Sequence, residues 1–227
     1  MKKIYILAVA ILVGASCTYA QNEESRSLES FSEVSTSESI KVTLVKGNKN
    51  EARIITSNVD TDKVLTDING ESLNIHMTRG SYMNNSVEVI LTYSGELSKI
   101  KASSSGQIKS DNKLVSNELY VKASSSGKVY LDVSANQLKV DVSSSGKVEL
   151  SGQTKTQVVE ASSSGKYDGF DMVSEGAKVD VSSSGKVDIS VSKELFADAS
   201  SSGKVTYRGT PEKVMADTSS SGSVRKD

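Results

Sequence analysis

The tetrapeptide Ser-Ser-Ser-Gly occurs seven times in this chain of 227 residues, with its glycines at positions 106, 127, 146, 165, 185, 203 and 222. Successive glycines are therefore 21, 19, 19, 20, 18 and 19 residues apart. A period near 20 residues, sustained over many copies, is typical of proteins in which each structural unit stacks on its neighbours. The repeat constrains the architecture of the chain strongly and its biochemical activity hardly at all.

Each copy lies within a stretch of strict alternation. In the segment 138–150 every even-numbered residue is apolar or small, and every odd-numbered residue is charged or serine. Alternation with a period of two indicates a half-buried β-strand, because successive side chains point to opposite faces. The pattern predicts that Val140, Val142, Gly146 and the middle serine, Ser144, point inward.

The same pattern predicts a tight bend at each tetrapeptide. Glycine tolerates the dihedral angles and the close backbone approach that such a corner requires. The first and third serines, Ser143 and Ser145 in this copy, are expected to point outward. Their hydroxyls could bond to the local backbone or to the equivalent serine of the next repeat.

Near-identical repeats at one period favour parallel, in-register rungs over stacked hairpins. Neighbouring rungs would lie roughly 4.8 Å apart, so that seven copies span about 34 Å. Parallel crossovers of this kind are right-handed. We therefore predict an all-β chain: a right-handed parallel β-solenoid, or β-helix, over residues 101–227.

The amino-terminal half keeps the β pattern without the obvious repeat. Alternating sets occur at 40–44, 73–77 and 87–91, and the segment 34–40 resembles a degenerate copy that lacks its glycine. We predict that residues 31–100 form an irregular β region that caps or begins the solenoid, since the ends of solenoids need atypical units. Residues 21–30 are polar and are predicted to be a flexible leader.

The first 20 residues have the pattern of a secretory signal peptide. Two lysines precede a short apolar run from Ile4 to about Ala15, and small residues at 18–20 provide a cleavage site after Ala20. An alternative is a lipoprotein acylated on Cys17, the only cysteine in the chain; cleavage after Ala20 is favoured because the usual upstream leucine is missing. The chain is thus expected to be exported: periplasmic, outer-membrane-associated or extracellular. No segment is expected to span a membrane.

No residues stand out as a catalytic or metal site. The single histidine, His76, is out of phase with its apolar neighbours and is expected to be an exposed strand residue. A zinc site would need several nitrogen or sulfur donors, and no cofactor motif is found. The 27 basic and 28 acidic residues are intermixed, which argues against a nucleic-acid partner.

Two charged columns are the candidate binding features. Stacking the repeats in register forms two columns. One consists of the residues directly after each glycine, and the other of the residues five positions before each glycine. The first set contains Lys128, Lys147, Lys166, Lys186 and Lys204, and the second contains Asp141, Glu160, Asp180 and Asp198, preceded by Lys101 and Lys122 and followed by Asp217. A solvated surface of mixed charge is the plainest interpretation; the alternatives are divalent cations along the carboxylates and an acidic glycan along the lysines.

The chain also resembles a known family. Its segments are similar to those of the putative auto-transporter adhesin head, or GIN, domain proteins. The similar segments are the start at Phe31 and Val34, residues 40–44, 73–75, 87–91 and 97–100, and the serial Ser-Ser-Ser-Gly-Lys-Val units. The resemblance extends over residues 31–224. It implies a β-helical protein of the bacterial cell envelope and carries no catalytic motif.

Together these features predict a secreted or envelope-associated, non-enzymatic, adhesin-like binding or structural protein. Its partners would be cell-surface or extracellular glycans or proteins, and its open ends could pair to give a homo-oligomer. The alternative is a polysaccharide-acting β-helix enzyme, since glycoside hydrolysis uses two carboxylic acids at a set separation. The acids here recur evenly, whereas a catalytic pair would interrupt the repeat at one place.

Overall fold

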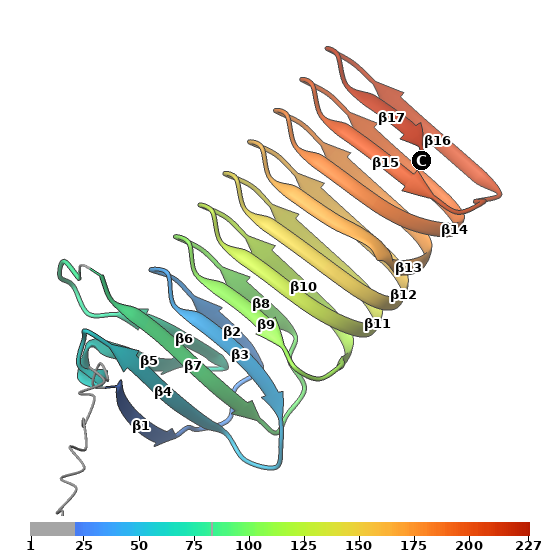
Figure 1. Cartoon of the computed structure of the whole chain (residues 1–227). Coiled ribbons are helices and arrows are strands. Elements are labelled where there is room, and N and C mark those ends of the chain that lie inside the picture. Colours follow the sequence, from blue (N-terminus) through green and yellow to red (C-terminus); the bar gives the residue numbers. More distant parts are fainter. Residues whose placement is uncertain (1–20, 83) are drawn as a thin grey trace, which may run out of the picture.

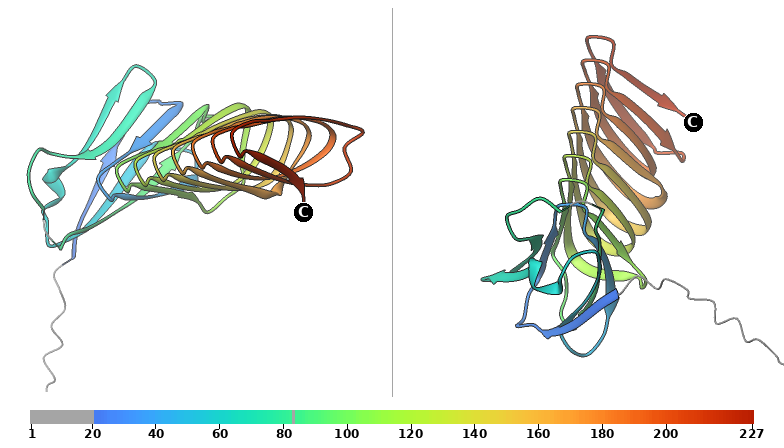
Figure 2. Two further views of the ribbon diagram at one scale, coloured as in Figure 1. Left: turned by 90° about the horizontal axis from the view of Figure 1, so that it is seen from above. Right: turned by 60° about the vertical axis from the view of Figure 1, so that its left-hand side comes forward.

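The structure, a computed structural model, describes residues 21–82 and 84–227. This part of the chain forms a flattened coil with two sheet faces, joined by the Ser-Ser-Ser-Gly turns at one edge and by a wider bend at the other (Figures 1 and 2). In Figure 1 the chain runs along the near face after each turn, returns along the far face, and advances as a right-handed coil. The predicted all-β solenoid is confirmed.

Ten strands make the repetitive part of the coil. They are β8 (Lys99–Ala102), β9 (Gln107–Ser110), β10 (Leu114–Ala123), β11 (Lys128–Val142), β12 (Lys147–Ala161), β13 (Lys166–Val181), β14 (Lys186–Ala199), β15 (Lys204–Arg208), β16 (Lys213–Thr218) and β17 (Ser223–Lys226). Each of β11 to β14 extends from one Ser-Ser-Ser-Gly turn to the next and therefore contributes to both faces. Neighbouring strands pair in parallel; Val129, for example, lies beside Val148, and Val140 beside Val159.

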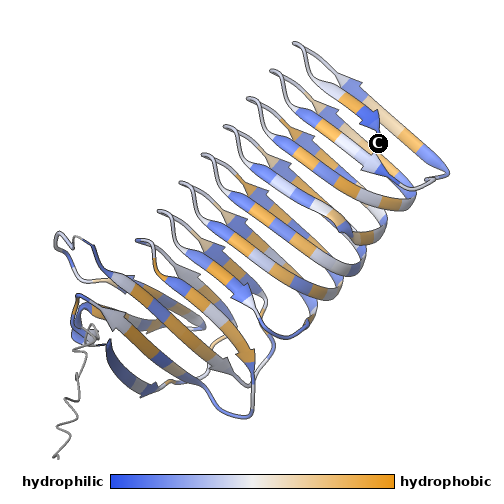
Figure 3. Cartoon of the chain, in the orientation of Figure 1, coloured by the Kyte–Doolittle hydropathy of each residue, from blue (hydrophilic) through white to orange (hydrophobic). Residues whose placement is uncertain are grey.

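The core follows the alternation in the sequence. In β11 the side chains of Val129, Leu131, Val133, Val140 and Val142 are all buried. Apolar bands in the same positions recur from strand to strand along the coil (Figure 3). Each rung thus buries a short row of branched side chains between the two faces, and these rows stack into one continuous core.

The Ser-Ser-Ser-Gly corner is a four-residue turn whose strain falls on serine. The Ser143 carbonyl accepts a hydrogen bond from the Gly146 N–H at 2.8 Å. Ser144 and Ser145 have φ angles of 49° and 61°, in the left-handed region. Two successive left-handed residues define a type I′ turn. The middle serine is therefore exposed, and its predicted inward orientation is wrong because the turn interrupts the strand alternation.

The glycine of each turn is needed for space rather than for a left-handed backbone. The turn glycines are absent from the residues with positive φ. A Cβ added to Gly146 would lie 2.5 Å from the carbonyl oxygen of Ala123 in the preceding rung. The prediction that glycine allows a close approach between backbones is therefore correct. The prediction that it provides unusual dihedral angles is wrong.

Backbone hydrogen bonds continue through the turns. The Ser145 N–H donates to the Ser163 carbonyl of the next rung at 3.1 Å, and equivalent bonds link the other turns. Within the described residues, the hydroxyls of Ser143, Ser144 and Ser145 form no hydrogen bond with the protein, so they bond neither to the local backbone nor to the equivalent serine of the next repeat. The stacked backbone, and not the hydroxyls, holds the serines in their left-handed conformation.

This strain leads to a testable prediction. Replacing Ser144 by Asn and Ser145 by Gly creates the pair that type I′ turns prefer, and we expect the free energy of unfolding to rise by about 1 kcal/mol. Urea denaturation followed by circular dichroism measures the change. An unchanged or lower stability would show that serine adopts this turn without strain.

The amino-terminal rungs are stacked in an order different from their order in the sequence. The first rung, formed by β2 (Glu33–Thr36) and β3 (Lys41–Lys46), lies between β8 and β9 on one side and β6 (Ser72–Met77) and β7 (Ser86–Tyr93) on the other. All of these pairings are parallel. The chain therefore leaves the first rung, builds the end rung, and then returns past the first rung to continue the coil.

The degenerate copy at 34–40 does form the turn of this first rung. Glu38 and Ser39 have φ angles of 58° and 63°, and the Ile40 N–H donates to the Ser37 carbonyl at 3.2 Å. Ile40 takes the place of the glycine and is fully buried. The end rung next to it joins β6 to β7 through residues 78–85 instead of a four-residue turn. The close approach between backbones that requires glycine in the other turns is therefore not repeated at Ile40.

Antiparallel strands close this end of the coil. β4 (Glu51–Ser57) pairs with β7, β1 (Gln21–Ser27) pairs with β4, and β5 (Val64–Asn69) pairs with β6 after a short 3₁₀ turn, η1 (Thr61–Lys63). Residues 21–30, predicted as a flexible leader, therefore begin with a strand that is hydrogen-bonded along its length. Composition could not reveal this because the strand is polar and its side chains are mostly exposed.

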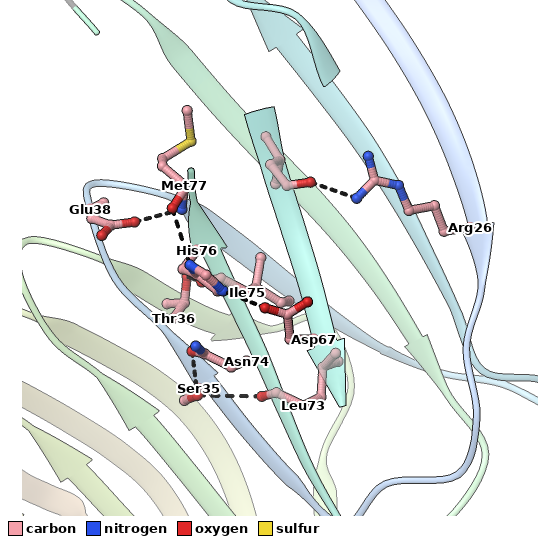
Figure 4. A network of polar contacts seen from close by, with 11 residues as sticks. Arg26, Ser35, Thr36, Glu38, Asp67, Leu73, Asn74, Ile75, His76 and Met77 are labelled. Carbon is pink, nitrogen blue, oxygen red and sulfur yellow. Dashed lines mark hydrogen bonds and ion pairs between the residues drawn. The ribbon is translucent and has the colours of Figure 1, made fainter. Parts of the chain in front are cut away.

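Arg26 links β1 to the opposite face. Its guanidinium donates to the Val64 carbonyl at 2.6 Å and to the Thr61 carbonyl at 2.9 Å. Figure 4 shows Arg26 reaching across to β5. Glu24 accepts two further bonds from the same guanidinium, at 2.8 and 2.9 Å, and these lower the pKa of the Glu24 carboxyl to about 2. The end of the coil is thus tied across its two faces by a charged, polar strand.

His76 lies in the same cap. Its Nε2 is 2.8 Å from Asp67 Oδ2, and its Nδ1 is 3.1 Å from the Met77 carbonyl oxygen (Figure 4). The side chain is 25% exposed. The predicted place in a strand is correct, but the predicted exposure is not: His76 is half-buried and joins β6 to β5.

Candidate binding surface

The predicted lysines are the first residues of β11 to β15, and these strands begin directly after the turns, on the near face in Figure 1. The five lysines are in register from rung to rung. Lys147 pairs with Glu149 at 2.8 Å and Lys186 with Asp188 at 2.5 Å. The bond to Glu149 raises the pKa of Lys147. Two of the five charges are thus balanced by acids on their own strands.

The predicted acidic column lies on the other face, directly before the turns. Asp141, Glu160, Asp180 and Asp198 are in register. Asp141 accepts bonds from Lys122 Nζ at 2.5 Å and from the Tyr120 hydroxyl at 3.1 Å. Glu160 pairs with Lys139 at 3.1 Å. The lysine and acidic columns therefore belong to opposite faces, separated by the row of serine turns, and cannot act as one site.

A third column runs beside the acidic one on the same face, and the sequence reasoning missed it. Its members stand seven positions before each glycine, are in register along the coil, and alternate between lysine and apolar residues up to the last rung: Lys99, Tyr120, Lys139, Val158, Lys178, Phe196 and Met215. We call this set the ladder. The repeat itself carries the signal, since aligning the seven copies reveals apolar residues at an outward position.

The ladder exposes apolar surface among charges. Val158 is 37% exposed and Phe196 36%. Lys139 Nζ lies 5.8 Å from the centre of the Tyr120 ring, and Lys213 Nζ lies 5.0 Å from that of Phe196. Partial burial and the nearby Asp141 carboxylate raise the pKa of the Tyr120 hydroxyl, which therefore stays protonated and able to donate.

A shallow groove follows the ladder near its start. Side chains from three consecutive rungs line it: Glu118, Tyr120, Gln137, Lys139, Thr156 and Val158. Aromatic and aliphatic groups thus lie beside amide, ammonium and carboxylate groups on an extended, regular surface. Such a surface can bind a long ligand at several equivalent points, with apolar contacts along its centre and hydrogen bonds at its side.

A second groove lies at the bend edge, on the side opposite to the turns. Val115 and Val173, which are 69% and 54% exposed, line it together with polar residues. The polar side chains there mainly stabilise the bend: Thr154 bonds the Asn136 carbonyl at 3.2 Å, and Ser174 bonds the Ser190 carbonyl at 3.0 Å.

Inside the coil, one polar chain replaces part of the apolar core. The Tyr167 hydroxyl donates to Gln157 Oε1 at 3.1 Å, and Gln157 Nε2 donates to the Ser174 hydroxyl at 2.8 Å. Complete burial raises the pKa of Tyr167. These groups satisfy one another and are enclosed, so their role is structural.

Residues 21–82 and 84–227 contain neither a metal-binding cluster nor a membrane-spanning helix. No group of three or more His, Cys, Asp or Glu side chains there is arranged to hold a metal ion. The same residues include no helix with the length and hydropathy required to cross a bilayer. The predicted signal peptide, the cleavage after Ala20 and the acylation of Cys17 all fall outside the described residues.

Solved structures of bacterial proteins share this fold. A putative adhesin from Bacteroides fragilis superposes with a TM-score of 0.82 at 13% sequence identity, covering 92% of this chain and 98% of its own. A putative lipid binding protein from Parabacteroides distasonis gives 0.70 at 19% identity, with 91% and 96% coverage. A putative adhesin from the same organism gives 0.69 at 17% identity, with 92% and 97% coverage.

These likenesses concern the fold alone, because all three identities are low. A search of the curated proteins found no match to this chain. The family described as "putative auto-transporter adhesin, head GIN domain" matches residues 30–211, most of the chain. The resemblance seen in the sequence is therefore confirmed, and the chain belongs to this head GIN domain family.

Proposed function

We propose that this chain is an envelope-associated, non-enzymatic, adhesin-like protein that binds extracellular glycan chains along the ladder face. The observation that carries the proposal is the in-register column of Tyr120, Lys139, Val158 and Phe196 next to a column of carboxylates. The family description, with its adhesin label, supports attachment at the envelope or cell surface.

The chemistry of the two columns suits sugars. The apolar faces of sugar rings pack against aromatic and aliphatic side chains, and their hydroxyls donate to carboxylates. Asp141, Asp180 and Asp198 stand two residues after Lys139, Lys178 and Phe196 in their strands, and so face the same side about 7 Å away. Each rung contributes one weak contact, and several rungs acting on one chain add through effective concentration.

A panel of immobilised neutral and acidic glycans, probed with the purified protein at physiological salt, tests the proposal. We expect retention on at least one glycan class, and a loss of about fivefold in affinity for Phe196→Ala or Tyr120→Ala, in line with an aromatic contact of about 1 kcal/mol. Tyr130→Ala is the matched control, since Tyr130 points outward from the opposite face beneath Lys147.

The same panel separates the competing functions. If Lys166→Gln weakens glycan retention and Phe196→Ala does not, the binding site lies on the lysine column instead of the ladder. Release of reducing ends, abolished by substitution of one carboxylate, would establish the polysaccharide-acting enzyme instead. Binding to phosphatidylcholine vesicles without any glycan retention would favour a lipid ligand, and no binding to any probe would favour a structural role.

A further inference from the structure

The carboxy-terminal end of the coil is open. Among the described residues, β16 pairs only with β14 and β17 only with β15, so both strands have one unpaired side. Every residue of β16 is exposed. Unpaired edge strands present a row of backbone N–H and C=O groups that can pair with another chain.

Val214 and Ala216 at this edge lack the cover that their partners in the adjacent rung have. Val214 lies beside Leu195, and Ala216 beside Ala197, both of which are buried core residues. Val214 nevertheless remains 41% exposed, and Met215, on the outer face, 52% exposed. The core residues of the last rung are thus exposed to solvent on the side that faces away from the coil.

The amino-terminal end also has edge strands with one unpaired side, but their composition differs. Its outer strand, β1, is polar and carries Glu23, Glu24 and Arg26, and Arg26 ties the two faces together. Charged residues are a common protection of edge strands. The polar amino-terminal edge is thus protected against strand pairing, whereas the carboxy-terminal edge combines charged residues with uncovered core residues such as Val214.

The sequence of β16, Lys-Val-Met-Ala-Asp-Thr, complements itself when two copies run antiparallel. With the two Met215 residues opposite each other, Lys213 faces Asp217 of the second copy, and Val214 faces Ala216 of the second copy. Opposite charges meet twice on the outer face, and the inward residues meet on the inner face. Centring the pair between Met215 and Ala216 would instead set Val214 against Asp217, because a shift of one position mixes the two faces.

We propose that the protein forms a tail-to-tail dimer in which β16 pairs antiparallel with β16 of a second copy about a twofold axis at Met215. A twofold interface requires a self-complementary surface, which this register supplies. The pairing satisfies the free backbone groups of β16 and covers Val214 and Ala216. It also joins the ladders of the two copies at Met215, although the dimer does not depend on what the ladder binds.

Charge reversal and charge exchange test the register. Sedimentation equilibrium of the purified protein between about 1 and 200 μM should show a reversible dimer. Asp217→Lys or Lys213→Asp brings like charges together at both pairs, and each should raise the dissociation constant at least tenfold. The double variant Lys213→Asp with Asp217→Lys restores both pairs in exchanged positions and should recover most of the affinity. Glu23→Lys, on the protected edge, should have no effect.

A disulfide provides a second measurement that does not depend on affinity. Residues directly opposite each other in an antiparallel pair have Cα atoms about 4.5–5.5 Å apart, within the range of a disulfide. Met215→Cys in a Cys17→Ser background should therefore oxidise to a covalent dimer, while Val115→Cys, which is also exposed, should remain monomeric. A monomeric wild type at all concentrations, a charge exchange that fails to restore the dimer, or the absence of the Met215→Cys dimer would each overturn the proposal.

Discussion

Replacing Gly146 by valine will lower the free energy of unfolding by several kcal/mol, enough to remove most of the stability of an ordinary domain. The Cβ of any side chain at this position would lie 2.5 Å from the Ala123 carbonyl oxygen and 2.7 Å from its carbon. These atoms belong to the backbone of the preceding rung and are held by the Ser143 N–H bond to the same carbonyl. Relief would require neighbouring rungs to separate, and thermal melting followed by circular dichroism measures the loss.

Gly176 is the matched control for this experiment. It lies within a strand, β13, and not in a turn, and an added Cβ would meet nothing closer than the Thr156 methyl group at 3.9 Å. Gly176→Ala should therefore change stability by less than about 0.5 kcal/mol, as do most substitutions away from special features. Equal losses for the two variants would mean that glycine acts through chain flexibility and not through the space between rungs.

Replacing Val159 by aspartate will prevent the coil from folding, whereas the same substitution at Val158 will have little effect. Val159 is fully buried in the core, while its neighbour Val158 is 37% exposed on the ladder. A carboxylate at 159 would be buried without a partner, which costs several kcal/mol even if the group takes up a proton. At 158 it would lie in solvent between Lys139 and Lys178 of the adjacent rungs.

Urea unfolding and the yield of soluble protein report this difference. We expect Val159→Asp to be largely insoluble or to lack a cooperative transition, and Val158→Asp to unfold within about 1 kcal/mol of the wild type. Val159→Ala serves as an intermediate variant that keeps the site apolar and should cost about 2 kcal/mol through the cavity it creates. A cooperative, wild-type transition for Val159→Asp would contradict the inward assignment of residues 157, 159 and 161 in the second half of this strand.

The candidate site was only partly predictable. The lysine and acidic columns follow from counting positions relative to each glycine, and their in-register stacking is as expected. Their separation onto opposite faces was not apparent, because a turn that reverses the chain also carries the residues before and after it to different sheets. Tyr120 and Phe196 could have been found by the same count, but aromatic residues in alternating strands are usually assigned to the core.

The sequence by itself determined the repeating unit, the parallel stacking and the inward row of branched side chains, because these depend on a period of two within each strand and a period near 20 between strands. The tertiary structure alone decided three features: serine and not glycine takes the left-handed positions of the turn, the first rung lies inside the stack and not at its end, and a polar strand closes the coil. Each depends on contacts between rungs or between distant strands. Local pattern cannot encode them, since the space beside Gly146 is set by Ala123 of the preceding rung, and the place of β1 is set by β4 and by the carbonyl groups that Arg26 reaches.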